Sequence, residues 1–499
     1  MIRKNFLRAM MILLVVSVSS PALTAKFPIT DKKISDAVED ELRLDQAVPS
    51  ETIDVTTIDG IVTLTGTVNN ILAQERAARI AGIVTGVRSV VNQIKVTPPA
   101  LRRDSQIRRD VRTALMTDPA TDLYEIKVTV DDTEVTLSGT VDSWQERRLC
   151  ETVAKGVKGV TGVNNRIVVD WPDERVDFEI KQEIEKALDW DAFVNSALIN
   201  VTVKNGKVKL TGRVGSAAEK DQAMLDAYVT GVESVDTAQL EVNASIRDKV
   251  LRENKFVSKS EKEIQEAVKD ALLYDPRVSS FKISPEVEGT TVTLRGTVDN
   301  LKAKHAAERD AGNTAGVRIV NNRIKVRLLE QPEDKAIEDT VRKALRRDPY
   351  VESYEITVNS INGVVDLYGT VDTFFEKYRA DDVASRVTGV ILVDNNLNVQ
   401  HEAVPYVYDP YIDSWYGNDS YRERHPPVFP AKADWEIKND IAYQLFWSPF
   451  VDADQVTVTV NDGTAVLTGT VDSWSEYYAA ADNAYQGGAV YVDNELSVK

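Results

Sequence analysis

The stretch VTLTGTV, Val62–Val68, decides the fold, because nearly the same seven residues return five more times. The other copies are VTLSGTV from Val135, VKLTGRV from Val208, VTLRGTV from Val292, VDLYGTV from Val365 and AVLTGTV from Ala465. Apolar residues at alternate positions are typical of a β-strand with one buried face. The six copies therefore predict six similar structural units in one chain.

An amphipathic helix pattern lies upstream of each heptad. In the second copy Ile107, Val111 and Leu115 fall on one stripe of a helix. The first isoleucine of the stripe precedes the heptad glycine by 32 residues (107 to 139) in this copy and equally in the others. The pairs are Ile34–Gly66, Ile107–Gly139, Ile180–Gly212, Ile264–Gly296, Ile337–Gly369 and Ile437–Gly469. Equal spacing predicts a compact unit in which every loop is short.

A β-hairpin is predicted between this helix and the heptad glycine. In the third copy NVTVKNGKVKLTG alternates apolar and polar residues around Asn205-Gly206, a pair that tolerates positive φ and favours a tight turn. By the period of two, the heptad glycine lies on the inward face, where we expect close approach of a covering helix or a β-bulge. A phosphate-binding role is the sharper alternative, although the first heptad has no second glycine or lysine beside it. The structural glycines are Gly66, Gly139, Gly212, Gly296, Gly369 and Gly469.

A second helix is predicted after each heptad. Four copies begin it with a capping box, in which a hydroxyl and an acid satisfy free backbone N–H groups. These are Ser143/Glu146, Ser216/Glu219, Thr373/Glu376 and Ser473/Glu476. A glycine suited to a left-handed C-cap follows each helix, at Gly86, Gly162, Gly231, Gly316, Gly389 and Gly487-Gly488. A final strand, such as NQIKV ending at Val96, completes the unit.

Each unit is therefore predicted to be an α+β domain with the order α-β-β-α-β. Two helices cover one face of a three-stranded mixed sheet, and the chain is a tandem array of six such domains. We place the domains at residues 26–99, 100–171, 172–245, 258–330, 331–401 and 431–499, and call them repeats 1 to 6. Residues 246–257 form a charged linker and residues 402–430 a linker rich in aromatic residues and proline. We expect the six units to be separate folded modules.

This constellation resembles the BON domain, a family named for bacterial osmotically inducible and nodulation proteins. The resemblance rests on the V-x-L-x-G-x-V strand, the helix after it, and a GV turn before a strand of the V-x-N-x-(I/L)-x-V type, as in GVRSVVNQIKV and GVILVDNNLNV. It covers nearly the whole chain after the N-terminal segment. The resemblance implies a periplasmic or envelope protein without catalysis or cofactors, active in envelope maintenance or osmotic stress. It implies membrane phospholipid or envelope proteins as partners.

Composition excludes some classes of function. The chain has 499 residues, 43% hydrophobic and 28% charged, with a net charge of −18. An acidic chain is a poor ligand for nucleic acid, which requires clustered positive charge, so no nucleic acid is expected as a partner. No metal site and no catalytic residue is predicted, since the three histidines lack metal-ligand spacing and no nucleophile elbow is present.

The first 25 residues are typical of a cleavable export signal. Arg3, Lys4 and Arg8 precede the apolar run AMMILLVVSVSS, and the small residues of SPALTA follow it. We expect cleavage near Ala22 or Ala25 and a periplasmic location, with an uncleaved anchor as the alternative. The one cysteine, Cys150, is predicted to be a small core residue.

Two sets of aromatic residues are the candidate binding residues. Apolar residues stand just after the cap of the second helix, and in three copies they are Trp144, Phe374 and Trp474. Such a residue can pack against its own domain, or, if exposed, insert into a lipid headgroup layer. The aromatic linker adds Trp415 and Tyr416, which either pack on the fifth or sixth unit or recognise a partner or glycan. A structural protein whose repeats bind protein partners or one another is the alternative function.

Overall fold

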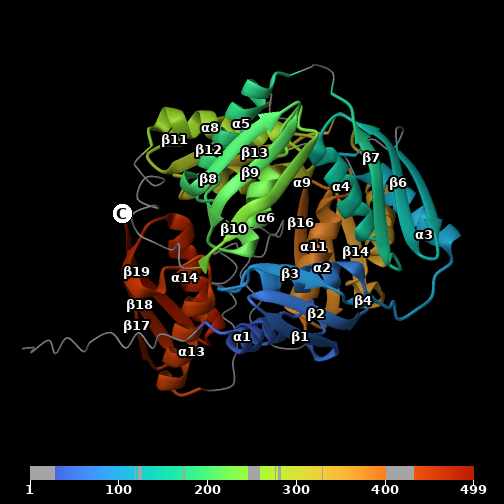
Figure 1. Ribbon diagram of the computed structural model, residues 1–499. Helices are drawn as coiled ribbons and strands as arrows, with labels where there is room; N and C mark the ends of the chain where they lie inside the picture. Colours follow the sequence, from blue (N-terminus) through green and yellow to red (C-terminus); the bar gives the residue numbers. More distant parts are fainter. Residues whose placement is uncertain are drawn as a thin grey trace, which may run out of the picture.

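The computed structural model describes residues 29–118, 120–121, 126–171, 175–244, 259–275, 277–278, 282–328, 330–400 and 432–499. Within these residues the predicted α-β-β-α-β order is confirmed in all six repeats (Figure 1). Repeat 1 contains α1 (Asp31–Leu44), β1 (Ile53–Ile58), β2 (Ile61–Val68), α2 (Ile71–Gly82), β3 (Ser89–Asn92) and β4 (Lys95–Val96). Repeat 2 contains α3 (Asp104–Thr117), β5 (Ile126–Asp131), β6 (Glu134–Val141), α4 (Trp144–Lys155) and β7 (Gly162–Val169). Repeat 3 contains α5 (Asp177–Trp190), β8 (Ile199–Lys204), β9 (Lys207–Val214), α6 (Ala217–Asp226) and β10 (Ser234–Val242).

The second half of the chain repeats this order. Repeat 4 contains α8 (Glu261–Tyr274), β11 (Ile283–Glu288), β12 (Thr291–Val298), α9 (Leu301–Gly312) and β13 (Ile319–Val326). Repeat 5 contains α10 (Asp334–Arg347), β14 (Ile356–Ile361), β15 (Val364–Val371), α11 (Phe374–Ser385) and β16 (Leu392–Val399). Repeat 6 contains α13 (Asp434–Trp447), β17 (Val456–Asn461), β18 (Thr464–Val471), α14 (Trp474–Gln486) and β19 (Tyr491–Val498).

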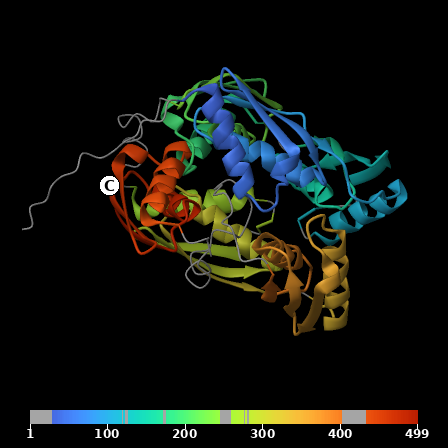
Figure 2. The ribbon, with the colours of Figure 1, turned by 90° about the horizontal axis from the view of Figure 1, so that it is seen from below.

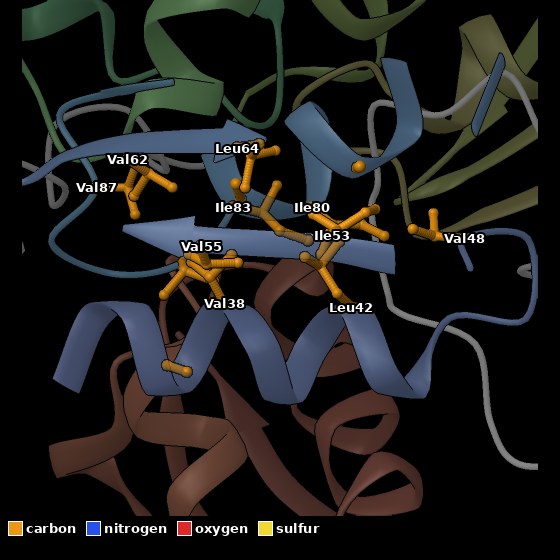
Figure 3. Packing of buried hydrophobic residues seen from close by; sticks show 14 of the residues in the cluster. Val38, Leu42, Val48, Ile53, Val55, Val62, Leu64, Ile80, Ile83 and Val87 are labelled. Carbon is orange, nitrogen blue, oxygen red and sulfur yellow. The ribbon is translucent and has the colours of Figure 1, made fainter. Parts of the chain in front are cut away.

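Each sheet belongs to one repeat, and the heptad forms its central strand. In repeat 5, β14 pairs antiparallel with β15, and β15 pairs parallel with β16. The same mixed three-stranded order holds in the other repeats, with the last strand of repeat 1 interrupted between β3 and β4. The two helices pack on one face of the sheet, and the apolar residues of the heptad strand point toward them. Figure 3 shows this core in repeat 1, where Val62 and Leu64 are fully buried against Val38 and Leu42 of α1.

An aspartate at the start of the first helix holds the hairpin turn. The carboxylate of Asp177 accepts hydrogen bonds from the backbone N–H groups of Asn205 and Gly206, at 2.8 and 2.9 Å. Asp31, Asp104, Asp334 and Asp434 bind their own hairpin turns in the same way. These backbone hydrogen bonds lower the pKa of Asp177, because they stabilise its charged form. This contact, which the sequence reading missed, ties the helix to the strand turn 28 residues away.

The heptad glycine is required for a reason other than the one predicted. Gly212 has a φ of +121°, a backbone conformation that side chains rarely adopt. A Cβ there would overlap the backbone carbonyl oxygen of Leu198, just before the first strand, rather than a covering helix. The expected β-bulge is also absent from this pair of strands, because Gly212 pairs in register with Ile199. The same conflict with a carbonyl oxygen occurs at Gly66, Gly296, Gly369 and Gly469.

One predicted C-cap glycine was wrong. In repeat 2 the left-handed position after the second helix is Gly159, with a φ of +92°, and Gly162 instead begins β7. The prediction chose the wrong glycine because the second repeat has the sequence GVKGVTGV, with three glycines near the turn. Cys150, in contrast, is the expected core residue: it is fully buried, and burial raises the pKa of its thiol to about 12.

We predict that Gly212→Ala destabilises repeat 3 by at least about 1–3 kcal/mol, because the new Cβ meets backbone that cannot move away. The measurement is the thermal unfolding midpoint of the full chain. Gly312→Ala is the matched control, since its Cβ would lie 3.9 Å from the nearest atom and helix α9 favours alanine. Equal midpoints for the two variants would contradict the strained role of Gly212.

Candidate functional site: the contacts between repeats

The repeats pair from the ends of the chain inward. In each pair, the last residue of the first helix of one repeat accepts a hydrogen bond through its backbone carbonyl oxygen. The donor is a backbone N–H of the other repeat, from the residue just before the left-handed glycine that follows the second helix. Trp447 accepts from Thr85 at 2.9 Å, Arg347 from Lys158 at 2.6 Å and Trp190 from Ala315 at 2.9 Å. Repeat 6 thus pairs with repeat 1, repeat 5 with repeat 2 and repeat 3 with repeat 4. Figures 1 and 2 show repeats 1 and 6, the two ends of the chain, side by side.

The pair of repeats 1 and 6 shares a hydrophobic cluster. The side chain of Trp447 is 2% exposed and lies in the core of repeat 1 rather than in that of repeat 6. Tyr443 and Phe446, also from α13, pack against this core, and the Tyr443 hydroxyl donates to Asp40 at 3.1 Å. Repeats 1 and 6 are therefore joined by a buried hydrophobic contact like that inside a domain core.

The residues just after the second-helix cap make a second kind of contact. In repeat 2 the Trp144 indole N–H donates to the Val232 carbonyl of repeat 3 at 2.6 Å, and its ring lies 4.6 Å from the Tyr228 ring. In repeat 6 the Arg318 guanidinium of repeat 4 lies 3.8 Å from the Trp474 ring centre. The corresponding residues Leu301 and Ala217 join the hydrophobic clusters of repeats 5 and 1.

A third kind of contact uses the residue two positions after the C-cap residue of the first helix. Phe193 of repeat 3 and Phe450 of repeat 6 meet edge to face at 6.5 Å. Tyr350 of repeat 5, at the corresponding position, packs on the core of repeat 1. Nearby, the backbone N–H of Phe375 donates to the Gln46 side chain at 3.2 Å.

The contacts of the residues after the second-helix cap describe two groups of three repeats, and the contacts of the third kind cross between these groups. In the first group repeat 2 docks on repeat 3, repeat 3 on repeat 1, and the ion pair Glu75–Lys155 joins repeats 1 and 2 at 2.5 Å. In the second group repeat 6 docks on repeat 4 and repeat 4 on repeat 5. The end-to-end pairs 1 with 6, 2 with 5 and 3 with 4 join the two groups. The first group thus forms a closed set of three contacts, and in the second group repeat 4 contacts both repeat 5 and repeat 6.

Charged groups are buried where the repeats meet. Lys302 of repeat 4 and Asp382 of repeat 5 form an ion pair at 2.8 Å, with 8% and 11% of their side chains exposed. Burial lowers the pKa of Lys302 to about 8. Although burial alone would raise the pKa of Asp382, the cations Arg386, Lys302 and Arg379 around it hold that pKa well below its usual range. The pair therefore stays ionised at neutral pH.

An aspartate caps the end of the first helix in five repeats. Asp45 accepts from Arg76 of the second helix at 2.8 Å, and Asp348 pairs with Arg379 at 2.7 Å. Asp118, Asp191 and Asp275 hold the corresponding positions, each accepting the N–H two residues on. The sequence reading missed these aspartates, although four of the five precede proline or alanine at a constant distance from the stripe isoleucine.

The structure brings two of the predicted binding residues, Trp144 and Trp474, into contacts between repeats. Trp144 and Trp474 are half-buried against repeats 3 and 4, and Phe374 is half-buried at the start of α11. Trp144 and Trp474 were expected to pack against their own domains, and the sequence analysis did not foresee their contacts with repeats 3 and 4. A contact of these rings with lipid stays a prediction. Trp415 and Tyr416 lie outside the described residues.

The described residues contain neither a candidate metal site nor a candidate membrane-spanning helix. No cluster of three or more His, Cys, Asp or Glu side chains there could hold a metal ion. No described helix is long and apolar enough to cross a membrane.

We predict that Trp447→Ala costs about 3–5 kcal/mol and weakens the contact of repeats 1 and 6, because it empties a buried site in the core of repeat 1. Differential scanning calorimetry of the full chain should show an earlier transition. Trp435→Ala is the matched control on the same helix, since Trp435 is 65% exposed. A variant at position 447 that melts like this control would mean that the two ends of the chain do not pack together.

A second prediction concerns Glu41, which is buried at the contact with repeat 6. Burial raises the pKa of Glu41 to about 8, against the partial relief of a hydrogen bond with Gln444. A carboxyl with a raised folded pKa stabilises the fold below its unfolded pKa and loses this contribution as pH rises toward 8. Glu41→Gln should therefore raise the melting temperature at pH 8 more than at pH 4.5. An equal change at both pH values would contradict the buried, protonated state.

The sequence model described as "BON domain" matches residues 30–98, 103–170, 176–244, 260–327, 333–401 and 433–499. Osmotically-inducible protein Y of Escherichia coli (strain K12) is 31% identical over 139 residues, which are 27% of this chain and 69% of that protein.

Among solved structures, CdsD, a structural protein of the type III secretion system of Chlamydia trachomatis, is 17% identical. The alignment covers 40% of this chain and 90% of that one, with a TM-score of 0.12. The six matches to the family, in contrast, span the described repeats almost completely. The chain belongs to the BON domain family and contains six copies of the domain.

Proposed function

We propose that the protein is a non-catalytic binding protein of the cell envelope that acts in osmotic stress or envelope maintenance. Six BON domains in one chain carry this proposal. The name of its relative, osmotically-inducible protein Y, supports the connection with osmotic stress. The basic and apolar N-terminal segment supports export to the periplasm.

Phospholipid or another envelope component is the proposed ligand. Net charge does not support simple attraction to an anionic bilayer, since the chain carries −18. An aromatic side chain can still insert into the bilayer beside a basic side chain that meets a lipid phosphate. Burial of apolar surface stabilises such insertion by about 25 cal/mol per Å² whatever the net charge of the protein. Arg147, whose guanidinium lies 5.0 Å from the Trp144 ring centre, is such a base.

A second candidate is a structural interaction protein, and the contacts between repeats favour it. Trp144, Trp474 and Leu301 already bind neighbouring repeats within the chain. We propose that a second copy, or a partner that carries BON domains, binds through contacts of the same kind on another part of the surface. Light scattering of the exported form distinguishes the two, because a mass of one chain at micromolar concentration would speak against self-association.

We predict that the mature protein co-sediments with vesicles of phosphatidylethanolamine and phosphatidylglycerol. The triple variant Trp144→Ala, Phe374→Ala and Trp474→Ala should bind less, if the rings contact lipid as proposed. A thermal melt must accompany the test, since two of the rings also pack against other repeats. A folded variant that binds as well as the parent would move the lipid contact to another surface, and a parent that does not bind would refute the lipid proposal.

A further inference from the structure

One of the three end-to-end pairs leaves a large, partly open cavity between its repeats. A space of about 650 Å³ lies between repeats 3 and 4 and is closed on a third side by α4 of repeat 2. The corresponding spaces are about 70 Å³ between repeats 2 and 5 and about 20 Å³ between repeats 1 and 6. The three pairs are built from the same elements, so the difference lies in side chains. A volume of about 300–1,000 Å³ is usual for a small-molecule site.

Carboxylates replace apolar residues at the wall of this cavity. Asp226 and Asp310 occupy corresponding positions near the ends of α6 and α9, and both line the space. The pair of repeats 2 and 5 has Val153 and Val383 there, while the pair of repeats 1 and 6 has Ile80 and the uncharged Asn483. A carboxylate inside a protein costs free energy unless it is fully hydrogen-bonded or paired. Two of them beside an open space therefore point to a function other than packing.

Most charges on the wall pair with one another. Asp275 accepts from Arg277 at 2.5 Å and from Arg309 at 3.1 Å. Arg309 also donates to Oδ1 of Asp310 at 3.2 Å. Lys186 and Asp270 form an ion pair across the two repeats.

One oxygen of Asp310, whose other oxygen pairs with Arg309, and the Arg148 guanidinium make no hydrogen bond with a described residue. Oδ2 of Asp310 is buried without a hydrogen bond. Burial and the nearby Asp275 raise the pKa of this carboxyl to about 7. The guanidinium of Arg148, which enters from α4, makes no hydrogen bond or ion pair with a described residue, although Asp226 attracts it from a longer distance. Arg148 is exposed to solvent. The surrounding protein lowers the pKa of its guanidinium.

We propose that this cavity binds a small organic zwitterion, whose oxyanion pairs with Arg148 and whose ammonium group donates to Asp310. Guanidinium is the side chain best suited to an oxyanion, and a carboxylate is the natural partner of an ammonium group. Trp190, Ala187 and Leu149 supply apolar surface for the carbon chain between the two charges. The inference goes beyond the proposed function and does not depend on it.

Isothermal titration of the full chain tests the proposal with two zwitterions and their halves. γ-Aminobutyrate carries a carboxylate, and glycerophosphoethanolamine carries the phosphate of a lipid headgroup, so these arms separate a free metabolite from a lipid source. Butylamine and butyrate supply one charge each. At least one zwitterion should bind, and it should bind at least tenfold more tightly than the halves. No binding up to 10 mM, or equal affinity for zwitterion and halves, would overturn the proposal.

Three variants test the two charged contacts. Arg148→Gln and Asp310→Asn should each weaken zwitterion binding at least tenfold, while Arg109→Gln, an exposed arginine on α3 of the same repeat, should leave it unchanged. Arg148→Lys keeps the charge and should restore part of the affinity. If Asp310→Asn melts earlier than the parent, the comparison of the three arginine variants decides. Unchanged affinity in Arg148→Gln would contradict the assigned site.

Discussion

The end of each first helix leaves backbone carbonyl groups without a partner inside the helix, and the repeats use them to bind one another. Trp190, Arg347 and Trp447 each offer such a carbonyl to a backbone N–H of another repeat. A backbone hydrogen bond requires its N–H and C=O groups to lie within a narrow range of distance and angle. Such a bond between two repeats therefore restricts the position of one repeat relative to the other. The side-chain contacts around it then follow: the Trp447 ring enters the core of repeat 1, and Lys158 lies beside Arg347 at the contact of repeats 2 and 5.

This constraint gives one domain design three different surroundings. A domain of this size buries a limited share of its surface alone, so contacts with neighbours contribute to its stability. At the pair of repeats 1 and 6 the contact is filled by Trp447, and the remaining space is about 20 Å³. At the pair of repeats 3 and 4 aspartates stand at the wall, and about 650 Å³ stays open. Fusion of six domains in one chain allows such divergence, because each copy can change without changing the other five.

Buried charges give the contacts specificity at a cost in stability. The pair Lys302–Asp382 joins repeats 4 and 5 and is largely removed from water, and a buried ion pair is often no more stabilising than apolar residues of the same shape. Removing one partner would leave an unpaired buried charge, which is costly. Some corresponding positions also differ in charge between repeats, as with Arg76 in repeat 1 and Gln222 in repeat 3. A repeat placed against a wrong neighbour would leave such groups unpaired.

The sequence by itself determined the elements within each repeat and their order. Period-two alternation around Leu64, the helical stripe at Ile107 and the turn pair Asn205-Gly206 are local patterns, and local patterns depend on neighbours in the chain. The need for glycine at Gly212 was also visible, but the carbonyl of Leu198 that excludes a side chain belongs to another strand and becomes apparent only in the folded sheet.

Only the tertiary structure decided what the outer surface of each repeat contacts. Trp144 reads as an aromatic residue at a helix start, whether it meets lipid, its own domain or Tyr228 of the next repeat. The pairing of repeat 1 with repeat 6 joins residues more than 360 positions apart, as in the hydrogen bond of Thr85 with Trp447. No periodicity in the chain records such a contact, because it depends on the shape and charge of two complete surfaces. For the same reason the cavity beside Arg148 and Asp310, formed by three repeats together, has no signature in any one of them.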